Sequence, residues 1–293
     1  MKQNKQNFHS IVIGAGAAGL MCAKHIAKTG SVLILEKQPQ LAAKVKISGG
    51  GKCNFTNLGV SANNYLCTNP HFVKSALARF TPQDIIKILQ QNHIQYEERQ
   101  NQQMFAFSAQ EIADMLLKQC LEKNVKIQTK CLIESVEKNN DIFKIETNFG
   151  CYTCANLIVA TGGVSYPKIG ATDFGYKIAR QFGHKIINPR PALVGLTPLP
   201  NLRDFCSDLA GVSVPVIITI GKKKIARDLL FTHLGISGPA VLIASLYWQS
   251  GQTFYIDFLN GQSLDDLLRQ QNKKTLSQII SNVLPSNFAK KIV

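Results

Sequence analysis

The chain has 293 residues, of which 45% are hydrophobic, and a formal net charge of +15. This length allows one large domain or two modest ones, and the mean hydropathy of zero is typical of a globular protein. The apolar run at residues 11–23 is too short to span a bilayer and contains glycines at regular spacing. We therefore exclude a signal peptide and a membrane partner, and we expect a cytoplasmic protein.

The positive charge is compatible with nucleic-acid binding. However, the lysines are scattered, with Lys222–Lys224 as the only run, and no aromatic residues alternate with them to form a stacking platform. We therefore favour a solvated basic surface and expect a small-molecule substrate, with a nucleic-acid partner the less favoured alternative. The oligomeric state is left open.

Eight cysteines without an export signal indicate reduced thiols rather than a disulfide framework. Cys151 and Cys154 form the only close pair, and they lie at the start of a predicted strand, not at a helix N-terminus. Neither a second such pair nor a neighbouring histidine pair completes a zinc site. We interpret both as small core residues and expect no metal.

The most informative motif lies at residues 10–36, where a predicted buried strand, a glycine-rich turn, a helix and a second strand follow one another. Gly14, Gly16 and Gly19 have the spacing of a dinucleotide-binding turn. In such a turn they permit, respectively, the sharp bend, the approach of a pyrophosphate, and close packing of helix on strand. Glu36 ends the second strand, where a carboxylate accepts ribose hydroxyls. The full context predicts a Rossmann-like α/β domain.

A second informative stretch is residues 44–57, KVKISGGGKCNFTN. Gly49, Gly50 and Gly51 can present successive backbone N–H groups to an anion. Lys44 and Lys52 add positive charge beside them. We interpret this stretch as a second set of cofactor contacts rather than a flexible hairpin.

These two blocks, with IVATGGVSYPKIGATDFGYKIARQFGH, PRPALVGL and LLFTHLGISGPAVL, resemble one family across essentially the whole chain. This family is the dehydro-bile-acid reductase-like flavoproteins, a bacterial NAD(P)/FAD-dependent group also labelled aminoacetone oxidase-like. The resemblance implies FAD as cofactor and NAD(P)H as a transient co-substrate. Lys52 stands where the family usually has arginine, which keeps the charge but loses the two-donor fork. The resemblance also implies these further cofactor contacts: Ala17, Ala18, Lys37, Ser48, Asn54, Ile133, Thr161 and Gly162.

The middle of the chain alternates between helical and strand patterns. We interpret the region from 69 to 123 as a flap over the cofactor domain. The predicted helices are 69–80, 81–92, 108–123 and 173–182, and the predicted strands are 95–99, 104–107, 125–129, 132–137, 143–147, 157–160 and 185–187.

Five prolines between residues 189 and 215 predict a domain boundary. We expect a three-layer FAD-binding domain at 1–190 and an inserted β-barrel-like plus helical domain at 191–293. Within the second domain we expect a hairpin around Gly221, a helix from Ala240, and a final helix from Thr275 toward the C-terminus. His233 is a weak candidate proton donor, because no carboxylate partner is visible and a structural role is favoured.

The expected function is FAD-dependent oxidoreduction, in which hydride passes between the flavin and a small organic substrate, with NAD(P)H or oxygen as second redox partner. Oxidase and reductase remain equally open. No Gly-Asp or Gly-Glu dipeptide closes a flavin site, and we expect a member truncated at its C-terminus. Two alternatives remain: a non-catalytic FAD-binding remnant and an RNA-associated flavoprotein.

Overall fold

A computed structural model describes residues 6–270 and 274–293. The chain divides into two compact units, Met1–Ile187 and Asn188–Val293. The division falls three residues before the boundary expected from the prolines.

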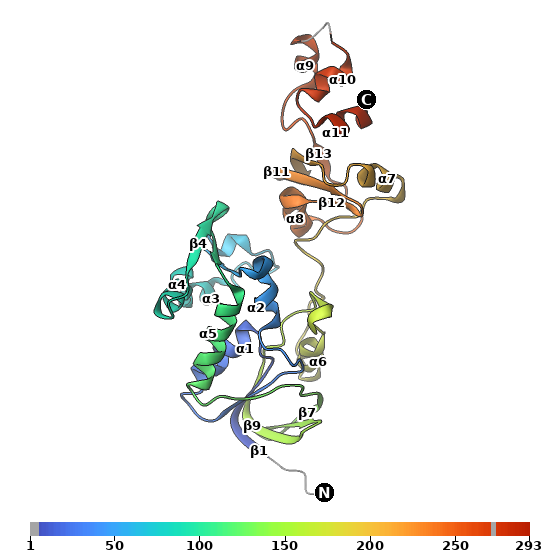
Figure 1. The fold of residues 1–293 in the computed structure, drawn as a ribbon. Helices are drawn as coiled ribbons and strands as arrows, with labels where there is room; N and C mark the ends of the chain where they lie inside the picture. The colour runs from blue at the N-terminus through green and yellow to red at the C-terminus, as the bar shows by residue number, and fades with distance from the viewer. Residues whose placement is uncertain (1–5, 271–273) are drawn as a thin grey trace. The chain divides into compact units, whose positions relative to one another are not determined.

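The first unit is built on a six-stranded sheet with the strand order β6-β2-β1-β9-β8-β7 (Figure 1). The first four strands run parallel, whereas β8 and β7 run antiparallel to their neighbours. The order β6-β2-β1 at one edge is the arrangement expected for a dinucleotide-binding sheet. The strands are β1 (Gln6–Ile13), β2 (Val32–Leu35), β6 (Lys126–Gln128), β7 (Ile133–Asn139), β8 (Ile142–Thr147) and β9 (Gly150–Val159).

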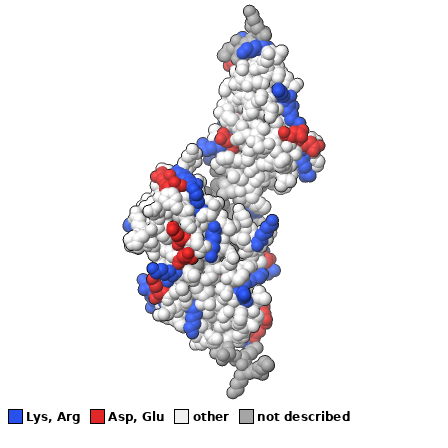
Figure 2. Space-filling model, viewed as in Figure 1, with Lys and Arg blue, Asp and Glu red and all other residues white. Residues whose placement is uncertain are grey.

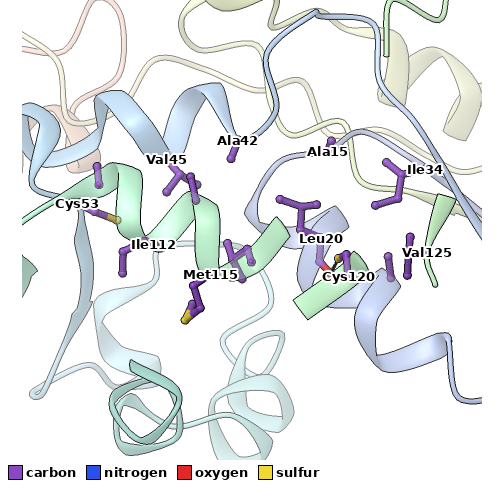
Figure 3. Packing of buried hydrophobic residues seen from close by; sticks show 14 of the residues in the cluster. Ala15, Leu20, Ile34, Ala42, Val45, Cys53, Ile112, Met115, Cys120 and Val125 are labelled. Atoms are coloured by element: carbon purple, nitrogen blue, oxygen red, sulfur yellow. Dashed lines mark hydrogen bonds between the residues drawn. The ribbon is translucent and has the colours of Figure 1, made fainter. Parts of the chain in front are cut away.

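Helices cover both faces of this sheet, as expected for strands that are apolar on both sides. On one face, α1 (Ala17–Ile26) and α5 (Ala109–Leu121) pack against Val12 and Ile34 of the central strands (Figures 1 and 3). On the other face, α6 (Phe174–Gln181) packs against the alternate residues of the same strands. The prediction of a Rossmann-like three-layer domain is confirmed.

Helix α5 is part of the core, so the interpretation of residues 69–123 as a flap is wrong for its last third. Six of its thirteen residues are buried, and the helix packs along α1 and α2 (Ala43–Ile47). Cys120 of α5 lies against the backbone of Leu20 in α1 (Figure 3). Burial, not the capping pattern, holds this helix, because the side chain of Ser108 makes no capping hydrogen bond.

The first unit also contains a separate three-stranded antiparallel sheet with the strand order β3-β5-β4. Its strands are β3 (Asn54–Asn57), β4 (Tyr96–Arg99) and β5 (Gln103–Ala106). All three strands precede α5 in the sequence. Helix α4 (Pro82–Gln91) begins with a capping box between Thr81 and Asp84, whereas α3 (Lys74–Arg79) is shorter than the predicted helix 69–80.

The second unit contains a four-stranded antiparallel sheet with the order β12-β11-β10-β13. Gly221 makes the turn of the predicted hairpin, with φ of +54°. Phe231, Phe258 and Phe288 join the sheet to the last helix through ring contacts of 4.8–6.3 Å. The elements are β10 (Ser213–Ile220), β11 (Lys223–Thr232), β12 (Gly235–Ser237), β13 (Tyr255–Asp257), α7 (Pro200–Asp208), α8 (Gly238–Tyr247), α9 (Leu264–Gln270), α10 (Leu276–Ser281) and α11 (Ser286–Ile292).

Two predicted elements differ from the structure. The single helix expected from Thr275 is two helices, because Pro285 begins a new helix and cannot continue the preceding one. Residues 185–187 form no strand. Within the described ranges, no helix has the length and apolar character needed to cross a membrane.

Candidate cofactor site

The three glycines of the turn between β1 and α1 differ in what surrounds them. Gly14 has φ of +105°, and a Cβ there would lie 2.6 Å from the carbonyl oxygen of Ala160. A Cβ on Gly19 would collide with the carbonyl oxygen of Gly14. A Cβ on Gly16 would meet no protein atom within 4 Å. Two glycines are therefore required by the protein's own packing, whereas Gly16 faces free space.

That space belongs to a cavity of about 440 Å³ at the carboxyl ends of β1, β2 and β9. Residues just after each of these strands line it: Gly14, Glu36 and Ala160. The N-terminus of α1 also opens into it through Gly16, Ala17 and Ala18. Because α1 has no side-chain cap, its first N–H groups and the positive end of its dipole are available to an anion.

A smaller cavity of about 190 Å³ adjoins the first. The two share lining residues, among them Gly14, Glu36 and Thr161. Lys37 and Ile133, both predicted cofactor contacts, line only this smaller cavity. Glu36 lines both cavities, and together they offer an elongated ligand a larger and a smaller compartment that meet at this residue.

The carboxylate of Glu36 is fixed by the backbone. Oε2 accepts the N–H of Ala15 at 2.7 Å, and Oε1 accepts the N–H of Gln38 at 2.7 Å. Each carboxylate oxygen can accept a second hydrogen bond. Glu36 is thus held in one orientation and can still accept ribose hydroxyls from the cavity side.

The second predicted stretch divides into two groups. Lys44, Ser48 and Asn54 line the larger cavity. The glycines at 49, 50 and 51 have φ of +56°, +68° and +86° in η1 (Ser48–Gly51), and they are exposed. Among the described residues, neither these glycines nor Lys52 is part of the lining of either cavity. Thr161 and Gly162, at the end of β9, do line the larger one.

Residues that the sequence did not single out form the apolar wall of the larger cavity. The wall consists of Phe55, Ile85, Ile112, Met115 and Leu116. The amphipathic pattern of α5 is visible in the sequence, but the face it turns to a ligand is set only by the packing of α5 on α1.

Cys53 also lines this cavity and is 6% exposed. Burial raises the pKa of its thiol above the ordinary value, so the group stays protonated at neutral pH. Cys151 and Cys154, in contrast, are buried in β9 away from the cavity lining, as free thiols.

His233 lies in the second unit, in the turn between β11 and β12, and its side chain is exposed. It makes no hydrogen bond or ion pair with the residues that the structure describes. Its role as a proton donor stays a prediction.

A glycine turn with one open position, an uncapped helix N-terminus and a fixed carboxylate after the second strand define a dinucleotide-binding protein of the Rossmann type. Each of these features fits one part of a dinucleotide: the turn and helix fit the pyrophosphate, and Glu36 fits a ribose. The chain belongs to the HI0933-like family, since the HI0933-like protein Rossmann domain matches residues 8–281.

Several curated proteins are similar to the chain, including the following three. A ribosomal RNA dihydrouridine synthase of Haemophilus influenzae is 43% identical, with 100% of this chain and 74% of that protein covered. A ribosomal RNA dihydrouridine synthase of Escherichia coli K12 is 41% identical, with 98% and 73% covered. A 3-dehydro-bile acid delta(4,6)-reductase of Clostridium scindens is 26% identical, with 82% and 60% covered.

Membership in this FAD/NAD(P) Rossmann family confirms the expectations of FAD as cofactor and of an oxidoreductase. The resemblance to dehydro-bile-acid reductases holds at the level of the family. The relative that carries the reductase name is more distant than the two named for ribosomal RNA.

Proposed function

We propose that the chain is an FAD-dependent reductase of uridine in ribosomal RNA. In this reaction the double bond between C5 and C6 of uracil takes up two hydrogens and becomes the single bond of dihydrouridine. The observation that carries the proposal is the name shared by two relatives that are 43% and 41% identical over 100% and 98% of this chain.

The reaction balances as a two-electron reduction. A hydride adds to C6, the electrons of the double bond move toward the C4 carbonyl, and a proton from solvent adds to C5. FAD held in this site and reduced by NAD(P)H would supply the hydride. The transfer of hydride to a carbon conjugated with a carbonyl makes the chain a reductase rather than an oxidase in this proposal.

The described residues have three duties in this scheme. The glycine turn and the N-terminus of α1 bind the pyrophosphate, and Glu36 binds the ribose beside it. The apolar wall contributed by α5 excludes water from the larger cavity, which strengthens the polar contacts made there. The second unit, beginning near residue 190, is proposed as a separate domain inserted in the cofactor domain.

The net charge supports an RNA substrate. A charge of +15 raises the rate at which a polyanion meets the protein, and it makes binding weaken as salt rises. In Figure 2, cations and acidic side chains are interspersed over the visible face of the first unit, so the attraction is not concentrated in one large patch on that face. A cytoplasmic location is proposed with this substrate.

A small conjugated ketone is the second candidate substrate, and the bile-acid reductase relative favours it. The chemistry is the same, because a double bond conjugated with a carbonyl accepts hydride at its far carbon. The two candidates differ only in what the rim of the cavity must bind.

The test uses an Escherichia coli strain from which the gene of the similar ribosomal RNA dihydrouridine synthase is deleted. The chain is expressed in this strain, and ribosomal RNA is digested to nucleosides for mass spectrometry. Dihydrouridine, heavier than uridine by two hydrogens, should return with the parent chain and not with Gly16→Val. The RNA proposal would be contradicted if dihydrouridine stays absent when the deletion strain expresses the parent chain, although the purified parent chain holds FAD and reduces a conjugated ketone with NAD(P)H.

A further inference from the structure

The positive charge of the first unit is unevenly distributed along the chain. Residues 37–83 contain six lysine or arginine residues and no aspartate or glutamate. This stretch includes α2, η1 and β3, which supply Lys44, Ser48 and Asn54 to the larger cavity, called the cofactor cavity from here on. One wall of the cavity is therefore built from a segment that carries only positive charge.

A second stretch without acidic residues, 147–172, supplies another part of the cavity lining. It contains the end of β9 and the loop that follows, and Gly162, Gly163, Ile169 and Gly170 of this loop line the cavity. The structure joins the two stretches directly, because Nζ of Lys44 donates to Oγ of Ser165 at 2.9 Å. The sequence separates these two residues by 121 positions.

Tyr166 lies at this junction, in the part of the loop whose two ends line the cavity. The residue is 63% exposed, and its backbone has φ of +63°, a conformation that is strained for a bulky residue. Nζ of Lys44 lies 5.9 Å from the ring centroid. The protein thus holds an aromatic ring outside its own core, against a cation, at the rim of the cofactor cavity.

Resting on the proposed function, we propose that Tyr166 is a stacking platform for an RNA base at the rim of the cavity, with Lys168, an exposed residue two positions further along the same loop, binding an adjacent phosphate. Stacking on an aromatic ring together with nearby cations is the usual way in which proteins bind single-stranded RNA. An unpaired strand is required, because a base must leave its helix to reach a flavin. The platform binds a neighbouring base while the target base enters the cavity.

The structure also explains why the sequence argued against such a platform. No aromatic residue lies near Lys44 in the sequence, and the ring is brought to the lysine only by the fold. The ring belongs to neither buried cluster of the first unit. Binding to an RNA base gives the exposed ring a function.

The experiment measures the affinity of a fluorescein-labelled, single-stranded RNA oligonucleotide by fluorescence anisotropy, with the FAD-loaded chain at several salt concentrations. Tyr166→Ala should weaken binding about 5- to 100-fold, whereas Tyr166→Phe should keep it. The matched control is Phe149→Ala. Phe149 is 48% exposed, and it precedes β9 at the end away from the cavity, roughly 30 Å along the strand.

The cation is tested through the salt dependence. Lys168→Ser should reduce the slope of log affinity against log salt by about 0.7, the contribution of one phosphate contact to a single strand. Lys28→Ser is its control. Lys28 is exposed and follows α1 at the end away from the cavity.

Equal losses in Tyr166→Ala and Phe149→Ala would overturn the platform even if ribosomal RNA still acquires dihydrouridine, so the proposed function would stand. Binding of the parent to anionic phospholipid vesicles but not to the oligonucleotide would also overturn it. Unchanged flavin absorbance in every variant shows that the cofactor site is intact in these comparisons.

Discussion

The open position at Gly16 allows cofactor binding to be separated from folding. Gly16 has φ of –79°, which any residue adopts, and a Cβ there meets no protein atom within 4 Å. Gly16→Val should therefore cost no more than about 1 kcal/mol in the free energy of unfolding, mainly because Gly16 is the N-cap of α1 and valine is a poorer N-cap than glycine. The valine side chain occupies the space through which the pyrophosphate approaches α1.

The expected loss of FAD affinity follows from the hydrogen bonds that the valine prevents. A hydrogen bond to a charged group contributes about 1.5–3 kcal/mol. If two N–H groups of the first turn of α1 lose the pyrophosphate, FAD binding weakens by about 100-fold or more.

Gly19→Ala is the matched comparison, since the same turn is changed by a smaller side chain. Its Cβ collides with the carbonyl oxygen of Gly14, so α1 must move away from β1. Overpacking of this kind costs about 1–3 kcal/mol, which lowers the melting temperature by about 2–4 °C per kcal/mol in a unit of this size.

Both variants are stripped of flavin before thermal unfolding is followed by circular dichroism, because bound FAD would itself raise the melting temperature. FAD affinity is measured separately by quenching of flavin fluorescence. The reasoning is refuted if Gly16→Val binds FAD within about twofold of the parent, or if it lowers the melting temperature as much as Gly19→Ala does.

Three further predictions concern single groups. Glu36→Gln should weaken FAD binding several-fold and lower stability by about 1–2 kcal/mol, because the amide nitrogen cannot accept from Ala15 or Gln38; titration with FAD and urea unfolding measure the two effects. Burial raises the pKa of the Cys154 thiol to about 11, so the folded chain keeps a proton that the unfolded chain loses above its ordinary pKa of 9.0. The associated stability, up to about 2 kcal/mol, should be present below pH 9.0 and lost as pH rises to about 11, and urea unfolding of Cys154→Ala should show a smaller loss over this window. Cys67, which is exposed, should react with a thiol reagent in the folded chain, whereas the six buried cysteines should react only on unfolding.

The glycine turn could be predicted from the sequence because its glycines, its helix and Glu36 all lie within about thirty residues, although the backbone that closes Gly14 belongs to the distant Ala160. The strands at 10–13 and 31–35 were located within a few residues, and Thr81 was identified as a helix cap. The sequence predicted a buried strand at 157–160 and the start of a strand at Cys151 and Cys154, whereas the structure has one continuous strand, β9, from Gly150 to Val159. Its first half contains polar residues that look unlike a buried strand, such as Thr153, whose hydroxyl is paired with Asn7 of β1 at 3.2 Å.

The apolar wall and the rim of the cavity could not be predicted, because both depend on contacts between distant segments. Met115 lines the cavity only because α5 lies along α1. Tyr166 meets Lys44 only because the loop after β9 ends next to α2. A pattern in one segment cannot state which face another segment will meet.

The division of labour in this cavity has a consequence for substrate choice. In the proposed site the groups that meet the pyrophosphate are backbone N–H groups at Gly16, Ala17 and Ala18, which line the cavity, and such groups are the same in any sequence that keeps the glycine spacing. The cofactor site therefore leaves the substrate unspecified. The names of the relatives agree with this, since one names ribosomal RNA and another names a 3-dehydro-bile acid. Discrimination must then come from side chains outside the turn, and in the first unit the exposed ones at the cavity rim are Lys44, Tyr166 and their neighbours. Exchanging these residues should alter which substrate binds while the bound flavin stays unchanged.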